Sequence, residues 1–288
     1  MGVLLLAGTT ASGKSRLAIE IAERHDAVIV SADAMTIYRE LDIGTAKPSA
    51  MEQARVPHLG IDLRDIHESF DVSDFCELVE QAMQEHPRVV IAGGTTFWLS
   101  SLINPLAPLP PPSPETRAML EAMEDPHRAL AAIDPTAAAR LHPNDRVRVI
   151  RALEVFHLTG NTQTSIHARG PRTPPLEAEI VWLDRDDLKE RIDQRLQGMQ
   201  ADGYLEEAEA ALAKYPTGAP KPLKSFAYRH LIDHIRGDID LDEALRRTGR
   251  DTWQYARKQR TWARGLGWSR TDIEAANERA ICAFQATP

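Results

Sequence analysis

Short apolar runs alternate with amphipathic segments along most of the chain, which is typical of a parallel sheet covered by helices. Four runs have the length of buried strands: Val3–Ala7, Ala27–Ser31, Arg88–Ala92 and 178–184. Helical periodicity follows three of them, at 15–24, 73–85 or 186–202. After Ala201 the pattern is helical almost to the end, with breaks at 215–222 and near Gly237. The alternation predicts an α/β fold built on a parallel sheet.

Two proline-rich stretches enclose a segment of different texture. Residues 108–114 cannot form the interior of a helix, and neither can 170–175. The residues between them are rich in alanine and arginine and have a helical pattern. We therefore divide the chain into three segments. Residues 1–114 form the first part of the core, 115–175 an inserted all-helical domain, and 176–288 a last core strand with a helical C-terminal region.

Composition narrows the class of protein. The net charge of −8 over 288 residues argues against a protein that coats nucleic acid without selection. The chain has no apolar run of about 18 residues and no basic N-terminal segment, so we expect neither a membrane span nor a signal peptide. Cys76 and Cys282 are too few for a disulfide framework or a cysteine metal site, which favours a reducing, cytoplasmic location.

The segment Gly8–Ser15 follows the first apolar run and precedes an amphipathic helix. It matches the phosphate-binding pattern G-x-x-x-x-G-K-[ST], in which loop amides and a helix N-terminus face an anion. In this pattern Lys14 reaches the terminal phosphate and the Ser15 hydroxyl ligates Mg²⁺. The motif predicts a P-loop NTPase-like core and a phosphate ligand of unspecified identity. Its residues are Gly8, Thr9, Thr10, Ala11, Ser12, Gly13, Lys14 and Ser15.

Two polar residues follow predicted strands of the same sheet. Asp33 comes after the second strand, and Thr95 follows the pair Gly93 and Gly94 after the third. The carboxyl ends of parallel strands face the ligand crevice, so we expect Thr95 beside the phosphate loop and Asp33 as a general base or an outer-sphere magnesium residue. Both residue types also cap turns and helices, and the sequence leaves that alternative open.

Basic residues gather on predicted helices. On the segment Thr252–Arg264, three arginines spaced three and four apart form one basic face: Arg257, Arg260 and Arg264. Arg148 and Arg151 share a face of another helix. Such faces suit phosphate oxygens and base edges, although solvated helix faces carry the same pattern. On the helix 186–202, Arg191 and Arg195 are four apart, and we expect them to reach back toward the phosphate loop.

Together these segments resemble the tRNA dimethylallyltransferase family, also called tRNA isopentenyltransferases or IPP transferases. A phosphate loop alone is a weak family signal, but the string at 42–48 and the C-terminal Lys-Gln and Thr-Trp block make the resemblance specific. The matching segments occur in the family's order over residues 3–268. They are Gly8–Ser15, Ser31–Asp33, Ile37–Tyr38, Asp42–Pro48, Val56–His58, Gly93–Thr95, His142–Asp145, Arg151–Val155, Ala227–Arg229, Arg257–Gln259 and Thr261–Arg264.

The resemblance implies transfer of a dimethylallyl group from dimethylallyl pyrophosphate to the exocyclic N6 amine of the adenosine 3′ of the anticodon, at tRNA position 37. It implies that the phosphate loop and Arg195 hold the pyrophosphate that leaves, with Mg²⁺ bound partly by Ser15. Asp33 then takes the amine proton, and Thr95 hydrogen-bonds the bridging oxygen. The adenosine must leave the anticodon-loop stack to reach such a site.

The resemblance also implies that the inserted helices and the C-terminal helices clasp the anticodon stem-loop of the tRNA. We expect the enzyme to act as a monomer. The residues implicated in tRNA binding are Asp33, Ala34, Met35, Thr36, Arg148, Arg151, Tyr228, Arg229, Arg257, Lys258, Gln259, Thr261, Trp262 and Arg264.

Three places depart from the family's pattern, and two other classes of protein share the phosphate loop. The departures are Ala34, Thr96–Trp98 and Ala227, and they bear on substrate preference because Lys14 and Asp33 are unaffected. A small-molecule P-loop kinase would place ATP in the loop, but it has no need of two basic helix faces. A GTPase-like switch would need a guanine-specifying Asn-Lys-x-Asp string, which the sequence lacks.

Overall fold

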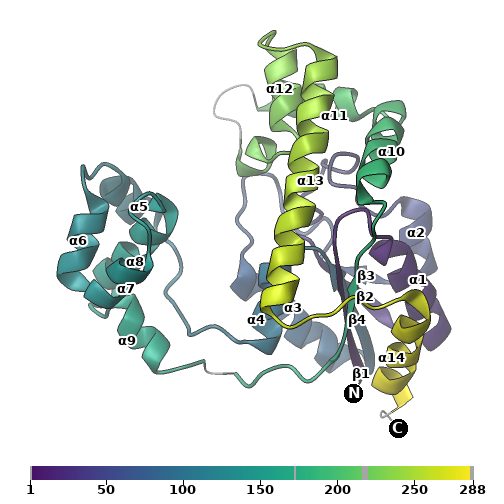
Figure 1. Cartoon of the computed structure of the whole chain (residues 1–288), viewed down its shortest axis with the longest axis horizontal. Coiled ribbons are helices and arrows are strands. Elements are labelled where there is room, and N and C mark those ends of the chain that lie inside the picture. Colours follow the sequence, from purple (N-terminus) through teal and green to yellow (C-terminus); the bar gives the residue numbers. More distant parts are fainter. Residues whose placement is uncertain (1, 172, 216–219, 286–288) are drawn as a thin grey trace. The chain divides into compact units, whose positions relative to one another are not determined.

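The computed structural model describes residues 2–171, 173–215 and 220–285 (Figure 1). The chain forms two compact units. We call Met1–Leu102 with Glu177–Pro288 the sheet unit, and Ile103–Leu176 the helical unit. The helical unit takes in the extended proline-rich stretch that precedes its first helix, whereas the sequence predicted an insertion over 115–175. No helix in the described ranges is long and apolar enough to cross a membrane.

Within the described residues, the sheet unit is built on five parallel strands in the order β3-β2-β4-β1-β5. These are β1 (Gly2–Gly8), β2 (Val28–Ala32), β3 (His58–Leu59), β4 (Arg88–Gly93) and β5 (Glu179–Leu183). At the centre of β1, Leu5 pairs with Ile91 of β4 and with Ile180 of β5. The predicted parallel α/β fold is confirmed. Only β3 was not predicted, because two residues are too few to show a pattern.

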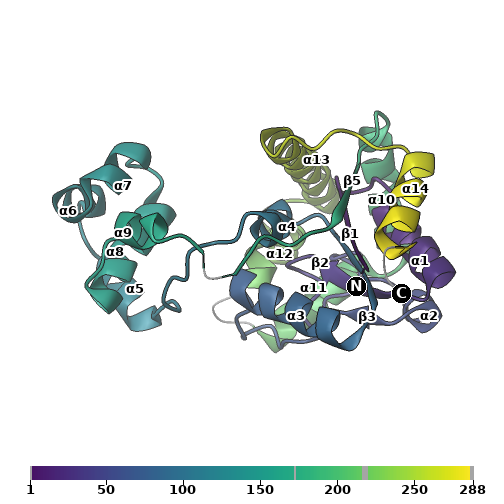
Figure 2. The same cartoon turned by 90° about the horizontal axis from the view of Figure 1, so that it is seen from below.

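Helices cover both faces of this sheet. The helical segments of the sheet unit are α1 (Lys14–His25), α2 (Ala50–Arg55), α3 (Val72–Glu85), α4 (Thr96–Ile103), α10 (Leu188–Ala201), α11 (Tyr204–Lys214), the 3₁₀ turn η1 (Lys221–Lys224), α12 (Arg229–Ile235), α13 (Leu241–Gly265) and α14 (Ile273–Gln285). α1 and α14 pack on one face and α3 on the other (Figure 2). The predicted segment Thr252–Arg264 is the second half of α13. Residues 216–219 of the predicted break lie outside the described residues.

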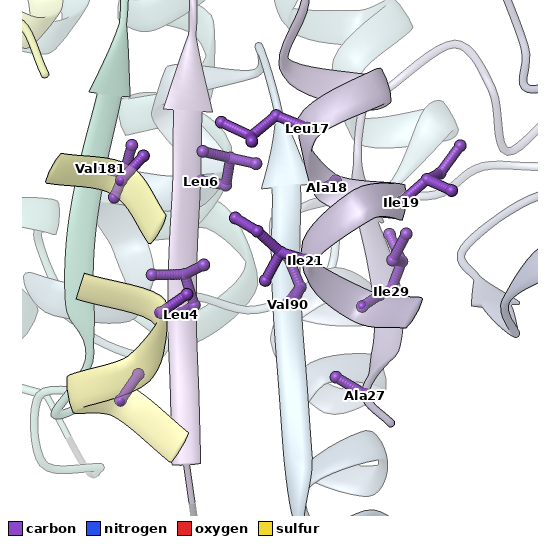
Figure 3. Packing of buried hydrophobic residues seen from close by; sticks show 14 of the residues in the cluster. Leu4, Leu6, Leu17, Ala18, Ile19, Ile21, Ala27, Ile29, Val90 and Val181 are labelled. Carbon is purple, nitrogen blue, oxygen red and sulfur yellow. The ribbon is translucent and has the colours of Figure 1, made fainter. Parts of the chain in front are cut away.

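The core under α1 explains why the phosphate loop is held firmly. Leu17 and Ile21, four residues apart on the helix, face Leu4 and Leu6 of β1 and Val90 of β4 (Figure 3). Alternate residues of a strand share a face and residues four apart on a helix share a face, so the two patterns meet here. Burial of one such side chain is worth about 1.5–3 kcal/mol. The start of α1 is therefore fixed against the sheet.

The helical unit has a small core of its own. Its helices are α5 (Pro114–Glu121), α6 (Pro126–Ile133), α7 (Pro135–Arg140), α8 (Arg146–Thr159) and α9 (Gln163–Ala168). The core contains Leu120 of α5, Leu130 of α6, and Val149 and Leu153 of α8, all fully or almost fully buried. The all-helical character predicted for the insertion is therefore confirmed, and the unit buries its apolar side chains within itself.

A buried carboxylate holds the start of α5 against α8. Glu154 accepts hydrogen bonds from the backbone amide of Ser113 (2.8 Å), from Arg117 (3.3 Å) and from Arg151 (2.5 Å). Burial tends to raise the pKa of Glu154, but these donors and charges together hold it below its usual value. Arg151, which the sequence assigned to tRNA binding, is thus engaged within the helical unit.

Candidate active site

The phosphate loop connects β1 to the N-terminus of α1, and its shape depends on glycine. At Gly13 the backbone has a φ of 94°, which favours glycine. A Cβ atom at Gly8 would lie 2.7 Å from the carbonyl oxygen of Leu183, so no larger residue fits there. Ala11 also takes a positive φ, 61°. The loop therefore turns tightly around the start of α1, where unpaired amides attract anions.

Three cationic side chains gather at this loop. Arg195 donates to the Thr10 hydroxyl (3.1 Å), and Arg191 donates to the carbonyl oxygen of Ala11 (2.7 Å). Burial, reinforced by the charge of Arg195, lowers the pKa of Lys14 to about 8. The expected reach of both arginines toward the loop is confirmed. Perturbed cations that crowd one cleft are typical of a site for a polyanion.

The turns that follow β2 and β4 meet beside the loop. Asp33 Oδ1 accepts a hydrogen bond from the Met35 amide (2.9 Å), so Asp33 does stabilise its own turn. Its Oδ2 has no hydrogen-bond partner within the described residues. The Thr95 hydroxyl accepts from the Ala34 amide (3.1 Å) and does not cap α4. The Thr95 side chain also lies close enough to Tyr255 to lower the pKa of that phenol, against the rise that burial causes.

Gln259 joins the phosphate loop to the turn that carries Thr95. Its Oε1 accepts from the Thr10 amide (2.9 Å), and its Nε2 donates to the carbonyl oxygen of Gly94 (2.7 Å). Tyr255, one helical turn earlier, donates to the same oxygen (3.1 Å). A Cβ atom at Gly94 would lie 2.5 Å from Gln259 Nε2. Gln259 was expected to contact tRNA, but it is only 1% exposed and braces the site from inside.

Most of these groups line one cavity of about 90 Å³ within the sheet unit, whereas Thr95 and Arg191 are not among its lining residues. Its charged and polar lining includes Lys14, Ser15, Asp33 and Arg195. Its apolar lining includes Ala18, Ile29, Ala46, Pro48 and Ala92. The cavity therefore combines an anion-binding wall with a short hydrocarbon wall.

Ser15 and Asp33 are the residues of this cavity that suit a magnesium ion. No group of three or more His, Cys, Asp or Glu residues close enough to hold a metal occurs in the part of the chain that the structure describes. Mg²⁺ commonly binds through one or two protein oxygens, the phosphates of a substrate, and water. One hydroxyl and one carboxylate beside a phosphate loop therefore fit an ion that arrives with a phosphate ligand.

The outer face of α13 is basic, but Arg260 does not belong to it. Arg260 Nε donates to Asp184 Oδ2 (2.8 Å), and the Thr9 hydroxyl donates to Oδ1 of the same carboxylate (3.2 Å). The prediction of a single face containing Arg260 was wrong, because this side chain turns inward and ties α13 to the phosphate loop. The residues of this part of α13 that were expected to bind tRNA and are exposed are Arg257, Lys258, Thr261, Trp262 and Arg264.

An exposed aromatic pair lies beside these cations. Trp262 of α13 and Phe97 of α4 meet edge to face, with ring centroids 6.2 Å apart. They are 42% and 43% exposed. Phe97 belongs to the departure Thr96–Trp98, whereas Trp98 stacks on Phe75 in the core (5.0 Å). Aromatic rings among cations are typical of surfaces that bind unpaired bases.

Other residues assigned to tRNA binding have different surroundings. Tyr228 is fully buried and offers no side-chain surface to a polynucleotide. Arg229 is about half exposed and ion-pairs with the buried Asp251. In the helical unit, Arg148 is exposed and ion-pairs with Asp145 (3.1 Å). The structure thus divides the predicted set into exposed and internal side chains.

Ala34, Met35 and Thr36 follow Asp33 in the turn after β2. Thr36 is buried, and its hydroxyl hydrogen-bonds Ser31 (3.0 Å). Ala34 and Met35 present their backbone amides to Thr95 and Asp33, as described above. Of these three residues of the predicted tRNA set, Thr36 lines the cavity next to the candidate base.

Sequence reasoning missed several residues that hold the site together. Tyr255 lies one helical turn before Gln259, so helical spacing offers a signal for it. Asp184 follows β5 directly, as Asp33 follows β2, which is a comparable signal. Glu207 on α11, whose contacts are described below, is one of several glutamates on its helix and has no distinguishing sequence signal.

The fold and site define a P-loop-like α/β protein whose phosphate loop opens beside a small hydrocarbon-lined cavity. The model of the IPP transferase family matches residues 36–266, and the chain belongs to that family. It is 40% identical over 269 residues to tRNA dimethylallyltransferase 1 of Citrifermentans bemidjiense, which covers 90% of this chain and 88% of that protein. The family resemblance predicted from the motifs is confirmed.

Solved structures agree with this assignment. A full-length tRNA isopentenylpyrophosphate transferase from Bacillus halodurans is 29% identical with a TM-score of 0.66, over 99% of this chain and 97% of that one. A eukaryotic dimethylallyltransferase acting on tRNA is 23% identical with a TM-score of 0.83, over 98% of this chain and 78% of that one. The second likeness concerns the fold alone.

Proposed function

We propose that the protein transfers a dimethylallyl group from dimethylallyl pyrophosphate to the N6 amine of the adenosine 3′ of the anticodon, at position 37 of a tRNA, and releases pyrophosphate. The observation that carries the proposal is the cavity that joins the phosphate loop to an apolar lining of Ala18, Ile29 and Ala92. A phosphate group and a short branched hydrocarbon are the two parts of this donor. Family membership supports the same chemistry.

In the proposed reaction the allylic carbon–oxygen bond breaks, and its electron pair leaves with the pyrophosphate. The adenine nitrogen forms the new bond to that carbon and loses a proton. Lys14, Arg191 and Arg195 stabilise the negative charge that develops on the leaving group. The Thr95 hydroxyl, which is oriented by the Ala34 amide, donates its proton to the bridging oxygen in this proposal.

Asp33 is the proposed general base. Its Oδ1 is held by the Met35 amide, so the carboxylate has a fixed orientation. Its charge acts on Lys14 and Arg195, which supports a base close to the cations proposed to bind the leaving phosphate. A positioned base contributes about 10²–10⁴-fold to the rate.

A magnesium ion is the proposed cofactor, and Ser15 would hold it together with the phosphate oxygens of the donor. When bound, it supplies additional positive charge to the pyrophosphate oxygens. The protein side chains supply the remaining charge and the orientation. This assignment is open to a direct test, because Ser15→Ala should raise the magnesium concentration needed for half-maximal rate more than it changes tRNA binding.

The proposed RNA surface comprises the exposed side chains of α13, namely Arg257, Lys258 and Arg264, with Trp262 for stacking. The target adenosine leaves its stack to reach the cavity, which requires an unpaired loop and favours the anticodon loop over a duplex. Arg148 provides an exposed cation on the helical unit. A monomeric state and a cytoplasmic location stay predictions.

The test is incubation of the protein with Mg²⁺, dimethylallyl pyrophosphate and unmodified tRNA, followed by nucleoside mass analysis. A prenylated adenosine mapped to position 37 is the expected product. Asp33→Asn keeps the acceptor for the Met35 amide but removes the base, so the rate should fall about 10²–10⁴-fold with tRNA affinity retained. Lys189→Met, an exposed change on α10, is the matched control. ATP turnover with small hydroxyl compounds and no prenylation would replace this proposal by the kinase alternative.

A further inference from the structure

A loop of the sheet unit forms part of the apolar wall of the cavity. Residues 42–48, which we call the wall segment, contribute Thr45, Ala46 and Pro48 to the lining. Ala46 takes a positive φ of 53°, so the segment follows a tight path. The position of this segment therefore sets the width of the space beside Ala18 and Ile29.

One carboxylate fixes the first half of the wall segment. Glu207 Oε2 accepts from the amides of Asp42 (2.6 Å) and Ile43 (2.8 Å). Its Oε1 accepts from the amide of Gly44 (2.9 Å) and from the hydroxyl of Tyr228 (2.7 Å). Consecutive backbone amides that converge on an anion form a strong, directional set of bonds.

Packing leaves the wall segment little freedom elsewhere. A Cβ atom at Gly44 would lie 2.6 Å from the rings of Tyr204 and Tyr228, so the backbone rests directly on these rings. The Lys47 side chain is 3% exposed and ion-pairs with Asp62 (2.6 Å). The first half of the segment is therefore held by Glu207 and the second half by Lys47.

We propose that Glu207 is a positioning residue that sets the length of the allylic chain the cavity accepts. The inference rests on the proposed prenyl transfer. Glu207 does not line the cavity, and it acts by keeping Thr45, Ala46 and Pro48 close to the opposite wall. A firmly held wall excludes a ten-carbon chain and grips a five-carbon chain, whereas a displaced wall does neither well.

Glu207→Gln tests this inference because the side chain keeps its size but one oxygen becomes a donor. That new amide group faces either the Asp42 and Ile43 amides or the Gly44 amide and Tyr228 hydroxyl, which are donors themselves. We expect the KM for dimethylallyl pyrophosphate to rise about tenfold or more, with the KM for tRNA within about twofold. The ratio of kcat/KM for geranyl to dimethylallyl pyrophosphate should rise about tenfold.

Two variants control the experiment. Glu209→Gln makes the same chemical change at an exposed position of α11, and it should leave both KM values unchanged. Tyr228→Phe removes one of the four donors to Glu207 and should shift the donor KM and chain-length ratio a few-fold in the same direction. It carries the test if Glu207→Gln does not fold.

The outcomes separate the inference from the function beneath it. If the wild-type protein prenylates tRNA but Glu207→Gln and Tyr228→Phe keep the donor KM and the chain-length ratio, the positioning role is overturned. If the wild-type protein prenylates no tRNA, the proposed function fails first. A selective rise in donor KM together with relaxed chain length supports the role of Glu207.

Discussion

Removing the positive charge of Lys14 should stabilise the protein while it abolishes activity. Burial and Arg195 lower the pKa of this lysine from 10.5 to about 8. The charged form of Lys14 therefore costs the folded protein free energy at neutral pH. Lys14→Met keeps the length of the side chain and removes the charge. The gap between the two pKa values corresponds to about 3 kcal/mol. Part of the side chain still meets solvent, so we expect a gain of about 2–3 kcal/mol.

The pH dependence has a definite sign. Below pH 8 both the folded and the unfolded chain bind the proton, and the full penalty is present in the wild-type protein. Between about pH 8 and 10.5 the folded protein releases the proton and the unfolded chain keeps it, so wild-type stability rises relative to the variant. The advantage of Lys14→Met should therefore shrink to about 1 kcal/mol at pH 9.5.

Urea unfolding of the free protein at pH 7 and pH 9.5, followed by tryptophan fluorescence, measures both values. Lys189→Met, at an exposed position of α10, is the control and should change stability by less than about 0.5 kcal/mol at either pH. A Lys14→Met protein that is no more stable than wild type at pH 7 would refute the reasoning. So would an advantage that does not change with pH.

Three further predictions follow from single contacts. Gln259→Leu should lower kcat/KM about 10–100-fold, because it leaves the Thr10 amide unpaired, and it should keep tRNA affinity within about twofold. A loss of tRNA affinity alone in binding assays would contradict the internal role of Gln259. Arg257→Ala combined with Arg264→Ala should reduce the salt slope of tRNA binding by about 1.5, whereas an unchanged slope would make this face merely solvated. Glu154→Gln should destabilise the helical unit by about 1–3 kcal/mol at neutral pH in thermal unfolding. Because the carboxyl pKa is lowered in the folded protein, this difference is present above the ordinary carboxyl pKa and is lost as the pH falls through the lowered one.

The fold was largely readable from the sequence because buried strands are continuous apolar runs. Val3–Ala7 and Arg88–Ala92 became β1 and β4 with changes of one residue at their ends. The start of the helical unit was less readable. Residues 104–113 form neither helix nor strand, so their membership of the helical unit depends on contacts such as that between Ser113 and Glu154, forty-one residues apart in the sequence.

The sequence predicted the parts of the site whose backbone geometry is fixed by a local motif. It did not predict the parts in which contacts between distant residues determine where a side chain points. Gly13 and Lys14 belong to a loop whose function follows from its local shape. Gln259 and Arg260 are neighbours in a basic block, and nothing local shows that both point inward. Their direction depends on how α13 is rotated against the phosphate loop, 249 residues away for the Thr10 contact.

The second half of α13 joins the phosphate loop to the exposed basic surface that we propose binds RNA. Its inward side chains, Gln259 and Arg260, hold the Thr10 amide and the Asp184 carboxylate, which in turn binds the Thr9 hydroxyl. Its outward side chains include Arg257 and the other exposed cations. Both sets of side chains project from one helix, so the outer cations have a fixed position relative to the phosphate loop. Gln259 is buried and fixes the Thr10 amide of the phosphate loop. We therefore expect the loss of its amide to impair the proposed reaction more than the loss of any one exposed arginine.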